Sequence, residues 1–412
     1  MPTSTNRYQL YLGKLKGNYK PAVKIEWLNA DDTVQTEITN YYIDMSGTLS
    51  VNMNNGCRRT CDISLDNSNG QFNITVENIW YGRKIRLWAG VYLDDGTPYY
   101  VPQGIFYITS VSEIRNPNQR TITMQCTDKW AFLDGSLWGY LDGIYIVPIG
   151  SNIYEAIESL LMTSRYTGEN VNDSGEPITN AVDFIAPMFS SYYLTKTYSD
   201  GDTTYQAIET PYEIRMEYGK TYADVLLEFA TMLGAYIFYN VDGRLTIEPT
   251  QDDIVDSAKP VLWTFTPNEQ EFMGENSTHD FQTFYNDVIV VGYILNGHQA
   301  IGRVSNENLS SQTCVQRNGR KTHEPYQDTA YYTDEQCVEL ANYYLKQLTI
   351  QKRSVTITSS PIYHIRENRL VNCVRPYTYV QEPLLVNGFS LPIGTTGSMS
   401  ISATSVNELT FS

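Results

Sequence analysis

Alternation of apolar and polar residues is the dominant pattern in the first third of the chain, and it predicts β-strands. Residues 84–93 read KIRLWAGVYL, and residues 104–109 and 120–126 alternate in a similar way. Successive side chains of a strand point to opposite faces, so this alternation is typical of a half-buried strand. We therefore predict that residues 1–140 are all β.

Turn signals divide these segments. The dipeptides Asn-Gly and Asp-Gly favour the tight turns of hairpins. They begin at ten positions, namely Asn55, Asn69, Asp95, Asp134, Asp142, Asp200, Asp242, Asn296, Asn318 and Asn387. Many are flanked by strand-like segments, which adds further strands to the expected fold.

Three segments have helical periodicity instead. Residues 151–162 begin with Asn152 and Glu155 at capping-box spacing. Residues 221–233 end before Gly234 and carry an apolar face of Tyr222, Val225, Leu226, Phe229 and Leu233. In residues 333–348, the side chains expected to face the core are those of Cys337, Leu340, Ala341, Tyr344 and Leu345. A hairpin is expected directly after the second helix, at 235–239 and 244–248, and strands at 287–295, 354–358, 369–374 and 398–405.

These elements predict a mainly β fold with an α+β middle. We expect a first β module over 1–140, a mixed α/β middle domain over 141–275, and a second β module with one helix over 276–412. Residues 163–210 are rich in Ser, Thr, Asn and Tyr without periodicity, which indicates a loop-rich insertion.

The charge balance narrows the possible partners. The chain has 412 residues, with 46 acidic and 29 basic side chains and a net charge of −17. A chain this acidic has no overall attraction for nucleic acid or for anionic membranes. No apolar run approaches the roughly 20 residues that span a bilayer, and the N-terminus does not resemble a secretory signal.

The residues that carry chemistry form no catalytic or metal-binding pattern. The six cysteines are scattered, no disulfide is expected between Cys57 and Cys61, and a reduced compartment is favoured. The four histidines lack zinc-site spacing, and residues 66–70 indicate a turn more strongly than a calcium loop. Residues 56–59 contain a small basic spot, which we interpret as a surface ion-pair site. We therefore predict no catalytic, cofactor-binding or metal-binding residues.

Tyrosine is unusually frequent, at 33 residues against 13 Phe and 6 Trp. Its large, stiff ring and its hydroxyl suit broad, partly wet contact surfaces. Half-buried strands also favour tyrosine, so this excess does not by itself indicate an interface.

The order of several motifs resembles the tail hub proteins of tailed phages and related contractile injection particles. In the first module these are NGCRRTCDISL (55–65), NGQF (69–72), WYGRKIRLWAG (80–90) and VPQGIFYIT (101–109). Next come YADVLLEFATMLGAY (222–236) with DGRLTI (242–247), then the helix at 333–348 with RSVTIT (353–358) and RLVN (369–372).

The resemblance implies two tube-like β-barrel modules flanking the middle domain and a homotrimeric ring. Such a ring caps the distal end of the tail tube, bound to the tube or a distal tail protein on one face. On the other face it binds a spike, fibre or other baseplate protein, while DNA or a tape measure protein passes through the lumen without specific binding. It implies a virion protein without enzymatic activity. The chain ends at Ser412, just after the expected hub, so lytic or receptor-binding activity is expected on other chains.

Two other functions remain open at this point. One is a peripheral baseplate or receptor-binding protein that recognises host surface carbohydrate through aromatic side chains. The other is a cell-wall hydrolase that uses two carboxylates.

Overall fold

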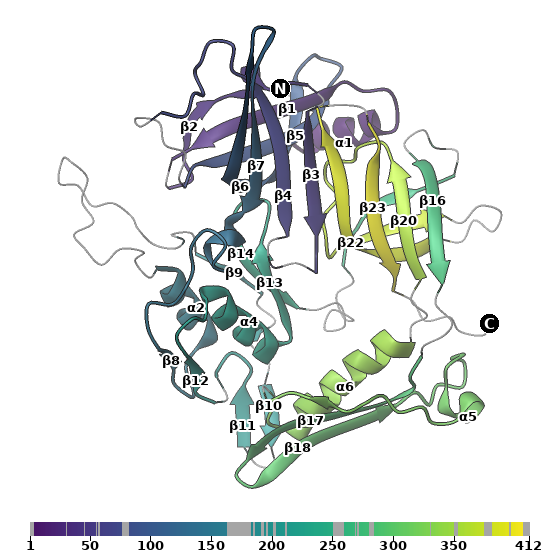
Figure 1. Ribbon diagram of the computed structural model, residues 1–412. Coiled ribbons are helices and arrows are strands. Elements are labelled where there is room, and N and C mark those ends of the chain that lie inside the picture. The colour runs from purple at the N-terminus through teal and green to yellow at the C-terminus, as the bar shows by residue number, and fades with distance from the viewer. Residues whose placement is uncertain are drawn as a thin grey trace.

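A large antiparallel sheet and a smaller α/β part below it make up the molecule in the computed structural model (Figure 1). The structure describes residues 4–29, 31–44, 46–54, 56, 58–75, 82–162, 183, 186–190, 193–194, 197–200, 203–210, 212–249, 259–267, 269, 272–279, 284–329, 331–349, 353–374, 381–394 and 397–406. The loop-rich insertion predicted at 163–210 lies largely outside these residues.

The large sheet contains both ends of the sequence. Its strands run in the order β16-β20-β23-β22-β3-β4-β7-β6-β5-β1-β2, and β21 pairs with both β22 and β15. The bounds are β1 Pro21–Leu28, β2 Val34–Glu37, β3 Gly47–Asn52, β4 Arg59–Asp66, β5 Lys84–Tyr92, β6 Pro98–Asn116, β7 Gln119–Asp128, β15 Val261–Phe265, β16 Phe272–His279, β20 Arg353–Ser359, β21 Leu370–Val374, β22 Gln381–Ile393 and β23 Met399–Ser405. The alternating segments at 84–93, 104–109 and 120–126 are thus confirmed as strands.

The two halves of this sheet are joined by the pairing of β22 with β3, in which Phe389 lies opposite Val51. The side chains beneath them form one hydrophobic core, with Leu49 and Ile63 from the first half and Leu391 and Ile401 from the second. Among the described strands the sheet stays open and does not close into a barrel, so the two separate barrels expected from the resemblance are not seen. The physical reason is that β3 and β22 pair along their edges, which joins the two halves into one sheet instead of leaving each edge to close its own barrel.

The smaller part has its own core, built around two helices. It comprises β8 Tyr145–Val147, α2 Ile153–Met162, β9 Met188–Phe189, β10 Thr197–Asp200, β11 Thr203–Gln206, β12 Ile214–Met216, α4 Tyr222–Leu233, β13 Ala235–Tyr239 and β14 Leu245–Pro249. A layer at the bottom of Figure 1 adds β17 Asp287–Leu295, β18 His298–Ser305, α5 Val315–Asn318, β19 Tyr326–Gln327 and α6 Asp334–Thr349. Side chains from α2, α4, β13, β17 and α6 share this second core. The domain limits at 140 and 275 remain predictions, because a shared core does not define which segments fold alone.

The three predicted helices and the hairpin after the second are confirmed. In α4, Thr221 accepts a hydrogen bond from the backbone of Asp224, whose carboxylate accepts one from the backbone of Thr221. Gly234 ends the helix in the left-handed conformation, at φ 59°, which glycine adopts without a steric penalty. Asn152 accepts hydrogen bonds from the backbone N–H groups of Tyr154 and Glu155 at the start of α2.

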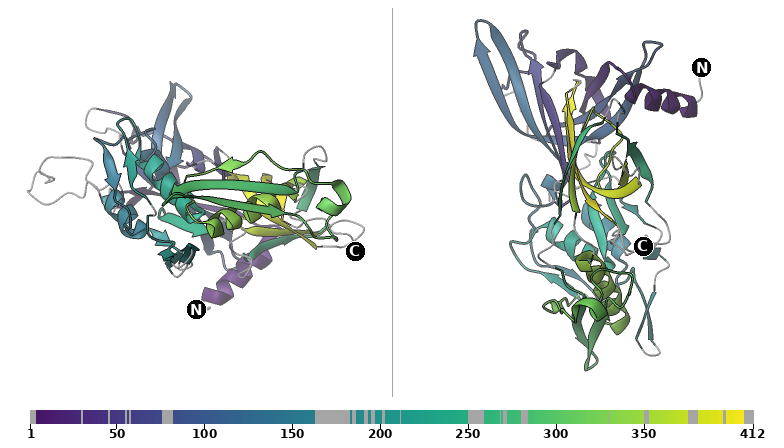
Figure 2. Two further views of the ribbon diagram at one scale, coloured as in Figure 1. Left: turned by 90° about the horizontal axis from the view of Figure 1, so that it is seen from below. Right: turned by 90° about the vertical axis from the view of Figure 1, so that its right-hand side faces the viewer.

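The prediction that residues 1–140 are all β is wrong at the N-terminus, where residues Ser4–Leu15 form helix α1. Short 3₁₀ turns also occur at Thr39–Tyr41 and Lys129–Phe132. Tyr11 and Leu15 are buried one helical turn apart, so packing on the large sheet stabilises a helix with few apolar residues. Figure 2 (right) shows α1 and the β6–β7 hairpin on opposite sides of the molecule.

A buried histidine links α1 by hydrogen bonds to the half of the large sheet that contains β15. His364 Nε2 lies 3.1 Å from the carbonyl oxygen of Leu262, and His364 Nδ1 lies 2.9 Å from the Tyr11 hydroxyl. A carbonyl only accepts, so Nε2 carries the proton and Nδ1 accepts from Tyr11. Burial lowers the pKa of His364 from 6.5 to about 4. The folded protein therefore holds this imidazole neutral.

We expect this histidine to make stability fall in mild acid. Between pH 6.5 and about 4 the unfolded chain binds a proton at His364 that the folded chain does not, so stability rises with pH across this window. The loss on acidification is at most about 3 kcal/mol. Urea unfolding at pH 7 and pH 5 measures it, and His364→Gln should give a smaller difference between the two. An equal difference in both proteins would show that other groups cause it.

Candidate functional site: a charged junction and the exposed surfaces

The histidines whose side chains are described, His298, His323 and His364, lie in different parts of the fold, and each has a structural partner, as does the turn at Asp66. His298 lies 3.2 Å from Asp334, and His323 stacks on Tyr326. Asp66 accepts hydrogen bonds from the backbone and side chain of Ser68, as expected of a turn. Within the described ranges, no group of three or more His, Cys, Asp or Glu side chains could hold a metal ion, and the cysteines are free thiols.

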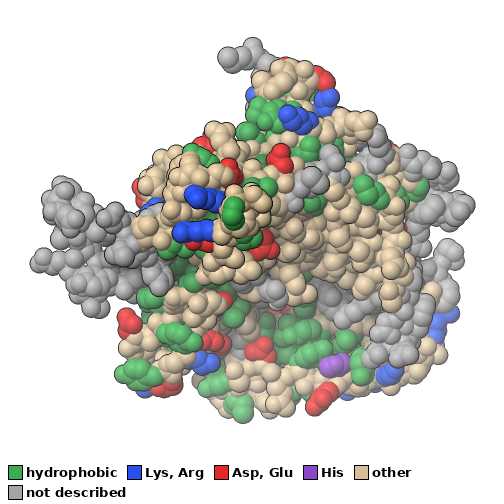
Figure 3. Space-filling model, turned by 45° about the horizontal axis from the view of Figure 1, so that its top comes forward, with side chains coloured by type: hydrophobic (Ala, Val, Ile, Leu, Met, Phe, Trp, Pro, Cys, Tyr) green, Lys and Arg blue, Asp and Glu red, His purple; other side chains and the backbone are tan. Residues whose placement is uncertain are grey.

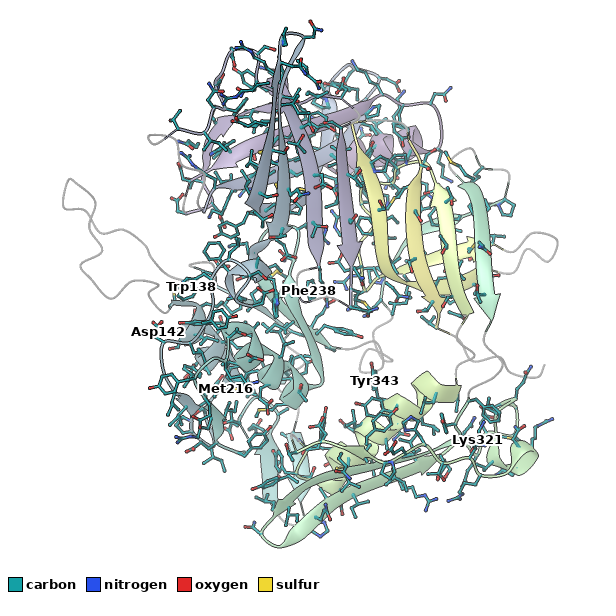
Figure 4. The ribbon with its side chains drawn as sticks, in the orientation of Figure 1. Trp138, Asp142, Met216, Phe238, Lys321 and Tyr343 are labelled. Atoms are coloured by element: carbon teal, nitrogen blue, oxygen red, sulfur yellow. The ribbon has the colours of Figure 1, made fainter. Side chains whose placement is uncertain are left out.

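The basic spot at residues 56–59 is not on the surface, which corrects the sequence-based interpretation. Arg58 and Arg59 are only 3% and 1% exposed. Both lie where the large sheet meets the hairpin of β13 and β14. The Arg58 guanidinium packs on the ring of Phe238, 3.8 Å from its centre, and Figure 4 shows Phe238 at this boundary. No local pattern in the sequence indicates this burial, because the partners are distant in the chain.

Arg59 is the centre of a buried ionic network. Its guanidinium forms an ion pair with Glu367 and donates to the carbonyl oxygen of Gln103, while its backbone N–H donates to Asp128. Burial raises the pKa of Glu367, but Arg59 and Arg58 lower it more, and the net pKa lies below the usual value. The carboxylate therefore stays ionised, and it joins the two halves of the large sheet at the boundary with the second core.

A second buried network lies beside the first. The Lys129 ammonium donates to Asp32, Asp183 and the carbonyl oxygen of Gly243, at 3.0, 2.8 and 3.0 Å. Lys84 pairs with the same Asp32. These bonds connect strands of the large sheet to the β13–β14 turn. Buried ion pairs contribute little net stability but penalise wrong arrangements, so the two networks fix how the parts of the molecule meet.

Three strands at the ends of the branched large sheet have one edge without a strand partner among the described residues. They are β2, whose four residues are all exposed, β16, and β15, which pairs only with β21. Open edges pair readily with strands of other chains.

Strand β8 and the segments that flank β8 and β12 in the sequence carry several exposed apolar side chains. They are Leu137, Tyr140, Ile144, Ile146, Ile149 and Tyr218, between 40% and 72% exposed. Apolar side chains gathered in this way mark surfaces that contact other molecules.

A hollow separates α4 from α6. Its volume is about 290 Å³, and it is lined by apolar and aromatic side chains that include Leu227, Leu340 and Tyr343, together with Asp328 and Glu339. Figure 3 shows hydrophobic side chains on the floor of a recess below the large sheet, and Figure 4 shows Tyr343 pointing upward from α6. The arrangement suits contact with another molecule and places no nucleophile beside a base.

Comparison with known proteins finds similarity in structure only. No protein-family model matches the sequence, and no curated protein matches it. A tail protein from Neisseria meningitidis MC58 superposes with a TM-score of 0.57 at 11% identity, covering 94% of this chain and 97% of that one. The 43 kDa tail protein of prophage MuSo2 from Shewanella oneidensis gives 0.52 at 11% identity, covering 92% and 98%.

The chain therefore has the fold of these two tail proteins over nearly its whole length. That fold combines a large antiparallel sheet with a smaller α/β part. Among the described residues, no helix is both long and apolar enough to cross a membrane.

Proposed function

We propose that the chain is a structural protein of a phage-type tail and serves as its hub. Three copies form a closed ring that caps the distal end of the tail tube. The ring joins the tube, or a distal tail protein, to the spike, fibre or other baseplate proteins below. In this proposal the chain is part of the virion, is not an enzyme and binds no cofactor or metal.

The observation that carries the proposal is the likeness in fold to two tail proteins over nearly the full length of each chain. A match over more than nine-tenths of each chain covers both cores and the junction between them. The buried ionic networks at that junction add support, because a component that bears load between a tube and a spike needs parts held in one arrangement.

The exposed surfaces support assembly into a ring. The open edges β2 and β16 lie at opposite ends of the same sheet. Contacts between different surfaces of identical chains close into a ring when the rotation permits. Each large sheet has two halves, so three chains would present six similar segments to a tube with six-fold symmetry. DNA would pass through without being held, since the chain is acidic overall.

We expect the purified chain to form trimers, more completely at moderate than at low ionic strength. Each copy carries a net charge of −17, so the copies repel one another. Raising the salt from about 0.01 M to 0.15 M shortens the screening length from about 30 Å to 8 Å and weakens this repulsion. Mass photometry at both salt concentrations measures the fraction of trimer. Monomers at both concentrations, with and without tube and spike proteins, would contradict the ring.

A further inference from the structure

The β6–β7 hairpin extends past the strands on either side of it. β5 follows β6 only as far as the pair Lys84–Tyr107, and β4 follows β7 only as far as the pair Asp66–Thr121. Beyond these pairs, residues 109–116 and 119–120 are exposed or half-buried. The hairpin tip stands at the top of Figure 1 and projects from one side in Figure 2 (right).

Two arginines face each other at this tip. Arg115 of β6 lies directly opposite Arg120 of β7 in the strand register. Like charges directly opposite each other on neighbouring strands destabilise the pair. Glu113 neutralises part of this charge through an ion pair of 2.7 Å with Arg115. Within the described part of the chain, the Arg120 guanidinium has no hydrogen-bond or ion-pair partner.

The arginines border a cavity that no acidic residue lines. Its volume is about 410 Å³, and its walls are Asn67, Asn73, Arg115, Asn116, Pro117 and Arg120. Asn67 is buried, and its amide is held by Asn73 and by the backbone N–H of Phe72. The Asn116 side-chain oxygen accepts from the backbone N–H of Asn118, so its amide N–H groups are left to donate outward. The cavity thus presents N–H donors and positive charge, which are the groups that bind a carboxylate.

We propose that the end of this hairpin binds carboxylates on the acidic surface of a second copy of the chain. We call this site, formed by Arg115, Asn116 and Arg120, the arginine tip. The inference rests on the proposed ring and specifies one of its contacts. Charge complementarity selects the partner, because a protein with 46 acidic and 29 basic side chains offers many carboxylates to a basic site on its neighbour. The contact offsets locally the repulsion between the copies and relieves the repulsion between Arg115 and Arg120.

Protection of an exposed strand edge does not account for these features. Such protection needs only charged side chains along the free edge. It requires neither two like charges in register nor a cavity between them. Both features are explained if an anionic group from outside completes the site.

The test compares trimer formation by charge variants of the full chain in mass photometry. Arg115→Glu with Arg120→Glu should weaken association at least about 100-fold, since each charge-assisted bond contributes about tenfold or more. Arg115→Lys with Arg120→Lys keeps the charge and should retain most of the association. The control is Arg317→Glu with Lys321→Glu, which changes the net charge equally at exposed positions in the bottom layer, where Figure 4 labels Lys321. This control should form trimers almost as the wild type does.

Several outcomes separate this inference from the proposed function. Unchanged trimers in the glutamate variant at the arginine tip would overturn the inference and leave the ring intact. Equal losses in this variant and in the control would show an effect of net charge alone and would also overturn it. A wild-type chain that stays monomeric would overturn both the inference and the ring. Retention of double-stranded DNA that is lost in the variant, while trimers persist, would assign the arginine tip to a different partner.

Discussion

Replacing Glu367 with Gln is expected to lower the free energy of unfolding by about 3–5 kcal/mol. The Glu367 and Arg59 side chains are 2% and 1% exposed and form an ion pair across the junction. The amide fills nearly the same space but carries no charge, so Arg59 is left as a buried cation without its counterion. Urea unfolding at pH 7, followed by circular dichroism, measures the change.

A double variant separates the loss of the pair from the cost of an unpaired charge. Arg59→Met with Glu367→Leu removes both charges and should be clearly more stable than Glu367→Gln alone, because replacing a whole buried pair with apolar groups is often neutral. A Glu367→Gln protein within about 1 kcal/mol of the wild type would show that solvent reaches the junction.

Replacing Phe229 with Ala is expected to cost about 3–5 kcal/mol. Phe229 lies on the inner face of α4, is 0% exposed and belongs to the second core. Deleting the ring removes apolar burial and leaves a cavity, which the surrounding side chains fill only in part. Thermal and urea unfolding both measure this loss.

Leu227 is the matched control for this substitution. It lies two residues earlier in the same helix and is 49% exposed. Leu227→Ala removes a large apolar side chain from the same element and should change stability by less than about 1 kcal/mol. Similar losses in the two variants would mean that the helix face is assigned wrongly.

The sequence predicts well those elements whose signals are local. The capping pair Thr221 and Asp224, the terminal Gly234 and the apolar face between them lie within fourteen residues, and the structure places α4 at Tyr222–Leu233. The hairpin after it and the strands β5, β6, β7, β20, β21 and β23 of the large sheet follow from local alternation and turn dipeptides in the same way. Helix α1 also has a helical pattern in its sequence, since Tyr8, Tyr11, Leu12 and Leu15 follow helical spacing. The other residues of this segment are mostly polar, which makes the pattern weak.

The joining of the two halves of the sheet could not be predicted from such signals. It depends on β3 and β22, which are more than three hundred residues apart, and their alternation is equally compatible with two separate barrels. The burial of Arg59 has the same origin, because Glu367 lies 308 residues away. A run of two arginines carries no mark of a distant partner, so the sequence alone favours a surface position for it.

Electron cryomicroscopy of the particle that contains the protein, with the chain fitted into the density, tests most directly whether the chain forms the ring at the distal end of a tail. We predict three copies in one closed ring between the tail tube and the spike or fibre proteins, with the large sheets facing the tube. Density that places the chain as separate peripheral copies, or in the head, would contradict the account.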